Sequence, residues 1–233
     1  MKQKKRGRSI VKYKVNAVYS TVQGEGCLTG TPIFLLRLQG CSVGCPWCDT
    51  KETWTAEPQH QVNDFWQLEP GHPYWIEKTQ SEIVQHLTNY LQPGPTWVML
   101  TGGEPAQQDL KSLVIALHDA GYKVSLETSG TATGHIGANL DWVCVSPKFG
   151  MPGGRSVLAE AVRKADELKF VVGKKLDLIR ILQFLKDHPL KPGCQICLQP
   201  LSFNEKATQL CIETVITNGW RLSLQMHKYL GLP

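Results

Sequence analysis

Three cysteines within eight residues give the clearest indication of chemistry in this sequence. They lie at spacings of four and three residues in Cys41-Ser-Val-Gly-Cys45-Pro-Trp-Cys48, so their thiols can converge on one small inorganic centre. A structural zinc site needs four protein ligands, and no obvious fourth ligand follows at the spacing of a zinc finger. An iron–sulfur cube usually takes four thiolates, so three would leave one iron open to an exchangeable ligand. We favour the cluster over a zinc loop or a chance grouping.

The spacing of apolar residues predicts the elements that position this loop. We expect strands at 33–38, 97–100, 123–126, 142–145, 168–172, 195–198 and 221–224, with an edge strand at 13–18. Helices are expected at 79–90, 109–120, 156–165, 176–186 and 205–217, the first opened by a capping box from Thr79 to Glu82. The helix at 176–186 should bury a stripe of Leu178, Ile179, Leu182 and Leu185.

Strands that alternate with helices indicate a parallel sheet with right-handed crossovers. The βα units are too few for a closed eight-fold barrel, so we expect an α/β fold in the form of an open, partial TIM-like barrel. One domain should span 11–233, with a basic disordered tail at 1–10 and an irregular, Trp- and Pro-rich insertion at about 51–78.

Polar, glycine-bearing segments follow six of the expected strands. Apart from the cysteine loop they are Thr101-Gly-Gly-Glu-Pro105, Glu127-Thr-Ser-Gly130, Ser146-Pro-Lys148, Gln199-Pro200 and Gln225-Met-His227-Lys228. The carboxyl ends of parallel strands meet at one edge of a sheet, where α/β folds assemble their sites. We therefore expect these segments to form the rim of one site.

Several rim residues have chemistry of their own. Gly102 and Gly103 can present bare backbone groups to an amino-acid moiety, whose ammonium group Glu104 can bind. Lys148 is either a cation of this site or a solvent-facing lysine. His227 is a base, a hydrogen-bond donor to a substrate or a structural histidine.

Two further residues raise the question of a charged ligand. Arg37 lies within a buried strand and needs a partner, either a protein carboxylate or an anionic substrate. Thr50 offers a hydroxyl to a hard cation such as Mg²⁺, for which Asp49 is the more usual type of ligand.

The charge of the chain is concentrated at its start. Five basic residues in 1–10 account for the net charge of +5, and the remaining 20 basic residues balance the 20 acidic ones. A neutral body fits a small substrate and argues against nucleic acid. No segment resembles a signal peptide or a membrane-spanning helix, so we expect a cytoplasmic protein without membrane contact.

Eight cysteines in a cytoplasmic protein indicate metal binding or catalysis before disulfides. Cys194 and Cys197 form a CxxC pair, but no second pair matches it and it lies in an apolar run. We therefore interpret these two as core cysteines.

The combined motifs resemble those of the 7-carboxy-7-deazaguanine synthases, a family of the radical S-adenosylmethionine (SAM) superfamily. The segments that carry the resemblance are Thr21-Val-Gln-Gly-Glu-Gly26, Arg37-Leu-Gln-Gly-Cys41, the cysteine loop with Asp49-Thr50, the rim segments above and His227-Lys-Tyr-Leu-Gly-Leu-Pro233. The resemblance runs from about residue 13 to the end. It implies ring contraction of 6-carboxy-5,6,7,8-tetrahydropterin to 7-carboxy-7-deazaguanine with loss of ammonia, on the route to queuosine.

The resemblance also implies roles for single residues. Cys41, Cys45 and Cys48 would hold a [4Fe–4S] cluster, and Thr50 would contact Mg²⁺. SAM would meet residues of the rim segments, namely Gly102, Gly103, Glu104, Ser146, Pro147, Lys148 and Gln199. The pterin would be lined by Val22, Gln23, Gly24, Glu25, Arg37, Thr101, His227 and the terminal carboxylate of Pro233. An electron donor such as a flavodoxin and a homodimeric assembly are further implications.

Two other functions stay open at this point. One is a different radical SAM enzyme, such as an activase that generates a glycyl radical on a partner protein. The other is a non-catalytic iron–sulfur or zinc module. The sequence leaves open the electron donor, the oligomeric state and the base that completes the proton transfers.

Overall fold

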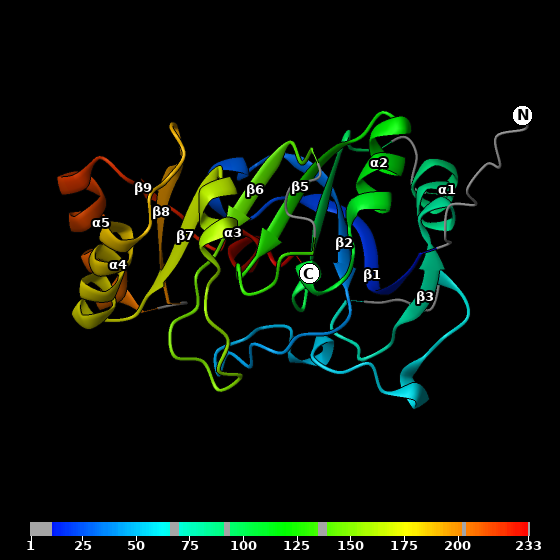
Figure 1. Ribbon diagram of the computed structural model, residues 1–233, viewed down its shortest axis with the longest axis horizontal. Coiled ribbons are helices and arrows are strands. Elements are labelled where there is room, and N and C mark those ends of the chain that lie inside the picture. Colours follow the sequence, from blue (N-terminus) through cyan, green and yellow to red (C-terminus); the bar gives the residue numbers. More distant parts are fainter. Residues whose placement is uncertain (1–10, 66–69, 91–93, 135–138, 202–203, 233) are drawn as a thin grey trace, which may run out of the picture.

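The computed structural model describes residues 11–65, 70–90, 94–134, 139–201 and 204–232. Within these ranges nine strands form one sheet in the order β3-β1-β2-β4-β5-β6-β7-β8-β9 (Figure 1). From β2 onward all neighbours are parallel; the strands are β2 (Pro32–Leu38), β4 (Trp97–Gly102), β5 (Lys123–Thr128), β6 (Trp142–Val145), β7 (Glu167–Val172), β8 (Gln195–Pro200) and β9 (Arg221–Leu222). The end strands β3 and β9 do not pair with each other, so the predicted open barrel is confirmed.

The amino-terminal side of the sheet differs from the prediction. The segment predicted as an edge strand forms β1 (Lys12–Val22), which lies inside the sheet between β2 and β3 (Ile76–Thr79) and is antiparallel to both. The edge prediction was wrong because β3 begins at the end of the segment 51–78, which we had expected to be irregular. Two 3-10 turns, η2 (Lys51–Thr53) and η3 (Pro58–His60), lie in the same segment.

Six helices lie within the described residues. They are α1 (Gln80–Tyr90), α2 (Lys111–Asp119), α3 (Ala159–Lys164), α4 (Lys175–Asp187), α5 (Glu205–Asn218) and α6 (Met226–Leu230). The capping box is confirmed, since Glu82 accepts from the backbone N–H of Thr79 at 2.9 Å and donates its own N–H to Thr79 Oγ1. The helix predicted at 156–165 is shorter, and α6 was not predicted. None of these helices combines the length and hydropathy that a membrane span requires.

The predicted stripe of α4 was partly wrong. Leu178 and Leu185 pack on the core, but Ile179 is 62% exposed and Leu182 is 46% exposed. Ile181 and Phe184 are buried in their place. The helix carries apolar residues on more than one face, so periodicity alone did not select the face that the sheet covers.

Alternation along the strands divides the sheet into two faces with different roles. One face carries the main hydrophobic core, packed against the helices, with residues such as Leu36, Leu100, Leu126 and Phe170. The opposite face turns inward and carries Arg37, Thr101, Glu127 and Lys169, which line a cavity. Successive side chains of a strand point to opposite faces, so the same strands build the core and present polar groups to a site.

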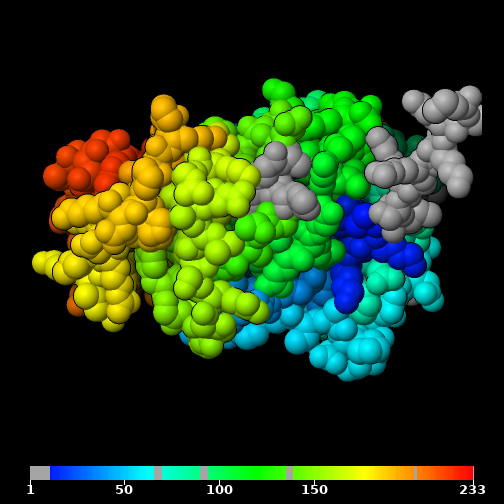
Figure 2. Space-filling view, viewed as in Figure 1, coloured from blue at the N-terminus to red at the C-terminus, as the bar shows by residue number. Residues whose placement is uncertain are grey.

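Loops from the carboxyl ends of the strands cover one side of the molecule. The cysteine loop and the segment 150–154 meet there, because the N–H of Gly153 donates to the carbonyl oxygen of Val43 at 3.1 Å. Figure 2 shows the blue-to-cyan and yellow-green segments side by side along this edge.

Candidate functional site

The cysteine loop is folded by backbone hydrogen bonds rather than by its thiols. The N–H of Gly40 donates to Thr53 O at 2.7 Å, and the N–H of Cys41 donates to Trp54 O at 3.0 Å. The N–H of Cys48 closes a turn onto Cys45 O at 3.0 Å. These bonds hold Cys41, Cys45 and Cys48 partly buried on the wall of one cavity.

The number of thiols on this wall bears on the choice between zinc and a cluster. Cys41, Cys45 and Cys48 line the same cavity. A structural zinc site takes four protein ligands, whereas an iron–sulfur cube held by three thiolates keeps one iron open. The donor set of three thiols therefore fits the cluster.

Gly102 and Gly103 let the end of β4 approach the cysteine loop. A Cβ added at Gly102 would lie 2.1 Å from Leu38 O, and one at Gly103 would lie 2.3 Å from Gly40 O. The N–H groups of Gly103 and Glu104 donate to those same two carbonyl oxygens, at 3.0 and 2.8 Å. Both positions therefore require glycine for packing, whatever ligand the segment also meets.

Glu104 is buried and joins β4 to β5. Its carboxylate accepts from the N–H of Ala106 at 3.1 Å, from Thr128 Oγ1 at 2.5 Å and from the N–H of Ser129 at 2.8 Å, and it also accepts from the hydroxyl of Ser129. These four donors hold the carboxylate in place, and Glu104 also lines the thiol cavity. Its predicted contact with a ligand ammonium stays a prediction.

The segment after β6 places a cation beside the thiols. Lys148 donates to Ser146 Oγ at 2.5 Å, and both residues line the cavity of the three cysteines together with Gln199. Burial lowers the pKa of Lys148. The alternative of a solvent-facing lysine is therefore excluded. Pro147 lines a neighbouring cavity next to Trp47 rather than this one.

A second cavity contains the remaining predicted residues. Its lining includes Val22, Gln23, Gly24, Glu25, Arg37, Thr101 and His227. It shares Glu25, Thr50 and Gly102 with the thiol cavity, so the two are adjacent chambers. Thr50 Oγ1 lies 3.6 Å from Cys48 Sγ at their junction.

Gly24 and His227 are in close contact in this second cavity. The N–H of Met226 donates to Gly24 O at 2.9 Å, and a Cβ at Gly24 would lie 2.6 Å from His227 Nδ1. Burial lowers the pKa of His227, which favours its neutral form. The α6 segment is therefore fixed against the loop after β1.

Arg37 has no ion-pair partner in the described residues, although it lines the second cavity. The sequence had left open whether a protein carboxylate or an anionic substrate balances this charge. Within the described ranges no carboxylate balances this charge, so an anionic substrate stays a prediction for Arg37.

A buried ion-pair network between the two cavities was not predicted. Lys169 Nζ lies 2.7 Å from Glu25 Oε2 and 3.0 Å from Glu127 Oε2. Gln225 donates to the other oxygen of Glu25 at 2.8 Å, and Gln23 donates to the other oxygen of Glu127 at 3.1 Å. A lysine within the apolar run 168–172 was the available signal, because a cation on the inner face of a strand needs buried partners.

Burial and charge have opposite effects on the pKa values of the carboxylates in this network. Burial alone would raise the pKa of Glu25, but the charge and hydrogen bond of Lys169 outweigh it and lower the pKa to about 2. Burial and the neighbouring carboxylates Glu25 and Glu167 raise the pKa of Glu127, although Lys169 opposes them. Asp49 and Lys228 form a second, longer pair at 3.5 Å on the rim.

Two of the predictions fall on residues that the structure does not describe. Pro233 and the basic tail at 1–10 lie outside the described ranges. Leu232, the last described residue, lines the second cavity and donates its N–H to His227 O at 2.9 Å.

Comparisons with known proteins agree on one family. The family model described as "Radical SAM superfamily" matches residues 35–150. The 7-carboxy-7-deazaguanine synthase of Escherichia coli (strain K12) is 39% identical over 95% of this chain and 100% of its own length. The enzymes of the same name from Buchnera aphidicola (36%; 94% of this chain, 99% of theirs) and Synechocystis (34%; 95% and 94%) are also similar. The crystal structure of QueE from Escherichia coli superimposes with a TM-score of 0.86 at 38% identity, covering 93% of this chain and 95% of that one.

Proposed function

Because the chain belongs to the 7-carboxy-7-deazaguanine synthase family of radical SAM enzymes, we propose that it converts 6-carboxy-5,6,7,8-tetrahydropterin to 7-carboxy-7-deazaguanine in queuosine biosynthesis. The reaction releases ammonia, which makes the enzyme a carbon–nitrogen lyase. The observation that carries the proposal is the pair of adjacent chambers, one lined by three thiols and the other by the polar residues of the family motifs.

Cys41, Cys45 and Cys48 would hold the [4Fe–4S] cluster. When bound, the cluster and SAM supply a one-electron cleavage that yields a hydrogen-abstracting radical. The protein must hold the thiols as thiolates, although burial raises the pKa of Cys41 and Cys45. Lys148 lowers the pKa of Cys45 by its positive charge and so assists.

SAM would lie in the thiol chamber. Its carboxylate would pair with the partly buried Lys148, and the strand ends at Gly102, Gly103, Ser146 and Gln199 would surround it. We assign Glu104 a positioning role, because its four hydrogen bonds hold Thr128 and Ser129 against the β4 loop. Pro147 would shape the loop from the neighbouring cavity.

The pterin would occupy the second chamber. Arg37, which has no ion-pair partner among the described residues, would pair with the substrate carboxylate, and Val22, Gln23, Gly24, Thr101 and His227 line the same space. Glu25 and Glu127 are fixed by Lys169, so their oxygens are oriented before the substrate arrives. This network would align the polar edge of the ring.

We further propose that Mg²⁺ binds at the junction of the chambers. Thr50 supplies a hydroxyl oxygen there, and the neighbouring Asp49 offers a carboxylate. Hard oxygen donors beside a substrate carboxylate match the preference of Mg²⁺ for one or two protein ligands plus substrate oxygens. Its chemistry would be that of a Lewis acid and a template.

The remaining partners follow from this chemistry. A flavodoxin-type protein would supply the electron, and the enzyme would act as a homodimer in the reducing cytoplasm, where thiolates persist. The neutral body of the chain supports a small substrate rather than nucleic acid or a membrane surface.

Anaerobic turnover tests the proposal. The reconstituted protein, supplied with reductant, SAM, Mg²⁺ and the carboxy-tetrahydropterin, should release 7-carboxy-7-deazaguanine and ammonia in equal amounts. Cleavage of SAM without conversion of the pterin would instead indicate another radical SAM enzyme, such as a glycyl-radical activase. Failure to cleave SAM at all would indicate a non-catalytic metal module.

A further inference from the structure

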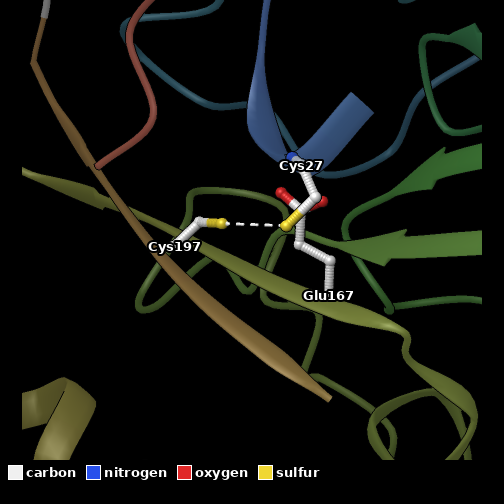
Figure 3. Close-up of side chains that lie close together, drawn as sticks. All are labelled: Cys27, Glu167 and Cys197. Carbon is white, nitrogen blue, oxygen red and sulfur yellow. Dashed lines mark hydrogen bonds between the residues drawn. The ribbon is translucent and has the colours of Figure 1, made fainter. Parts of the chain in front are cut away.

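A second group of metal-type ligands lies apart from the cysteine loop. Cys27 belongs to the 3-10 turn η1 (Gly26–Leu28), Glu167 begins β7 and Cys197 lies in β8. Their ligand atoms all lie within 4.8 Å of one another, and the two sulfurs are 3.6 Å apart. Figure 3 shows the three side chains converging from these separate elements.

The group lies nearer the amino-terminal ends of β7 and β8 than the two chambers do. Glu167 and Cys197 precede Lys169 and Gln199 by two residues on β7 and β8, so they point to the same inner face. Two residues along a strand correspond to about 7 Å. Glu167 and Cys197 are each 1% exposed, whereas Cys27 is only partly buried. The group is therefore an interior feature with access from the η1 side.

The CxxC spacing of the sequence does not create this group. Cys194 packs against the main hydrophobic core instead. Cys197 meets Cys27, which is 170 residues away in the chain.

The carboxylate of Glu167 is held in place by hydrogen bonds to only one of its two oxygens. Its Oε2 accepts from the N–H of Cys27 at 2.9 Å and from Trp142 Nε1 at 3.3 Å. Its Oε1 is buried and has no hydrogen-bond partner. A buried carboxylate oxygen without a partner is costly, and donors on the other oxygen are the usual way in which proteins orient a metal-binding carboxylate.

The spacing of the sulfurs fits one small ion. Two thiolates on a tetrahedral zinc ion lie about 3.8 Å apart, close to the 3.6 Å between Cys27 and Cys197. We propose that Cys27, Cys197 and Glu167 form a binding site for a single thiophilic divalent cation, with Zn²⁺ as its occupant and water in the fourth position. Thiolate ligands select such a cation over Mg²⁺.

The assignment leaves one net negative charge at the site and releases the protons of both thiols. Two thiolates and one carboxylate carry three negative charges, of which the cation offsets two. The hydrogen bond that the Cys197 thiol makes with Cys27 and its burial raise the pKa of this thiol well above its usual range. Cation binding must therefore displace the thiol protons to solvent.

The site would connect distant parts of the chain. Through Cys27 it would fix η1, which directly follows the predicted substrate residues 22–25, to β7 and β8. Since the ligands come from three elements, binding to the folded chain alone would raise its thermal stability.

Metal titration of the cluster-loaded protein tests the site, because the cluster then occupies Cys41, Cys45 and Cys48. We expect one equivalent of Zn²⁺ per chain beyond the iron, and with Co²⁺ as the probe an ultraviolet charge-transfer band typical of thiolate ligation. Cys27→Ser and Cys197→Ser should each lose both, and Glu167→Gln should weaken binding at least tenfold. Cys211→Ser, which removes a buried core cysteine outside the group, should retain the full equivalent.

The wild-type titration stands even if a variant fails to fold, because it needs no substitution. A wild-type protein without the extra equivalent and the thiolate band would overturn the proposal. So would full binding in folded Cys27→Ser, or a Cys27–Cys197 disulfide that after reduction takes up no cation. A rise in melting temperature on adding Zn²⁺ to wild type, absent in Cys27→Ser, would support it.

Discussion

The two thiol groups of this protein are built in opposite ways. Cys41, Cys45 and Cys48 come from one loop, whose backbone hydrogen bonds determine their positions. Cys27, Glu167 and Cys197 come from three elements and meet only because the sheet is folded. The first group should therefore tolerate loss of the second, whereas the second depends on the entire inner face of the barrel.

Removing a thiol of the loop should have the largest effect. Cys45→Ser deletes one of three ligands to the proposed cluster, so we expect turnover to fall at least about 1,000-fold, together with iron content. Zinc uptake at the second group should be unchanged. Iron and zinc analysis of the same preparation measures both, and retained iron with full activity in Cys45→Ser would contradict the assignment.

Lys169 tests how far the inner face depends on charge. Lys169→Met leaves the largely buried Glu25 and Glu127 without their cation, and we expect the free energy of unfolding to fall by about 3–5 kcal/mol. Urea denaturation checks this, with the exposed Lys206→Met as the control. A loss below about 1 kcal/mol would show that the network contributes little.

The pH dependence of stability sharpens the same point. The pKa of Glu25 is lowered to about 2 in the folded chain, so its contribution is fully present above its unfolded value near 4.5 and is lost as the pH falls toward 2. Lys169→Met should flatten this part of the curve. Chemical denaturation between pH 6 and pH 3 measures how steeply the free energy of unfolding changes with pH. Equal slopes in wild type and Lys169→Met would show that Lys169 does not cause this pH dependence.

The packing of the cysteine loop on β4 predicts a smaller effect. Gly103→Ala places a Cβ 2.3 Å from Gly40 O, and overpacking of this kind costs about 1–3 kcal/mol. Gly193→Ala serves as a matched control, because its Cβ enters open space and meets only the cost of a positive φ. Gly103→Ala should also lower iron retention, whereas Gly193→Ala should not. Equal iron retention in Gly103→Ala and Gly193→Ala would show that the packing of β4 does not help to hold the cysteine loop.

Arg37 should give the smallest change. Arg37→Gln removes the proposed partner of the substrate carboxylate, and we expect KM for the pterin to rise about tenfold or more. Reductive cleavage of SAM should stay within about twofold of wild type. Steady-state kinetics with both readouts decides, and an unchanged KM would assign Arg37 a different role.

The same contrast explains what the sequence could predict. The cysteine loop, the open barrel and the rim segments depend on residues that are close together in the sequence and on the alternation of polar and apolar residues along strands. They could therefore be predicted from the sequence. The Lys169 network and the contact of Cys27 with Cys197 join residues 42 to 170 positions apart, which no local pattern encodes. The strand β3 was missed because its four residues follow a long polar segment, and α4 was misread because it is apolar on several faces.

The central claim is that three thiols hold a cluster with one iron open to SAM. Iron analysis together with electron paramagnetic resonance of the reduced, anaerobic protein tests it most directly. We predict about four irons per chain at this loop and a signal that changes when SAM is added. One zinc ion bound by Cys41, Cys45 and Cys48, or a cluster signal that SAM leaves unchanged, would contradict the account.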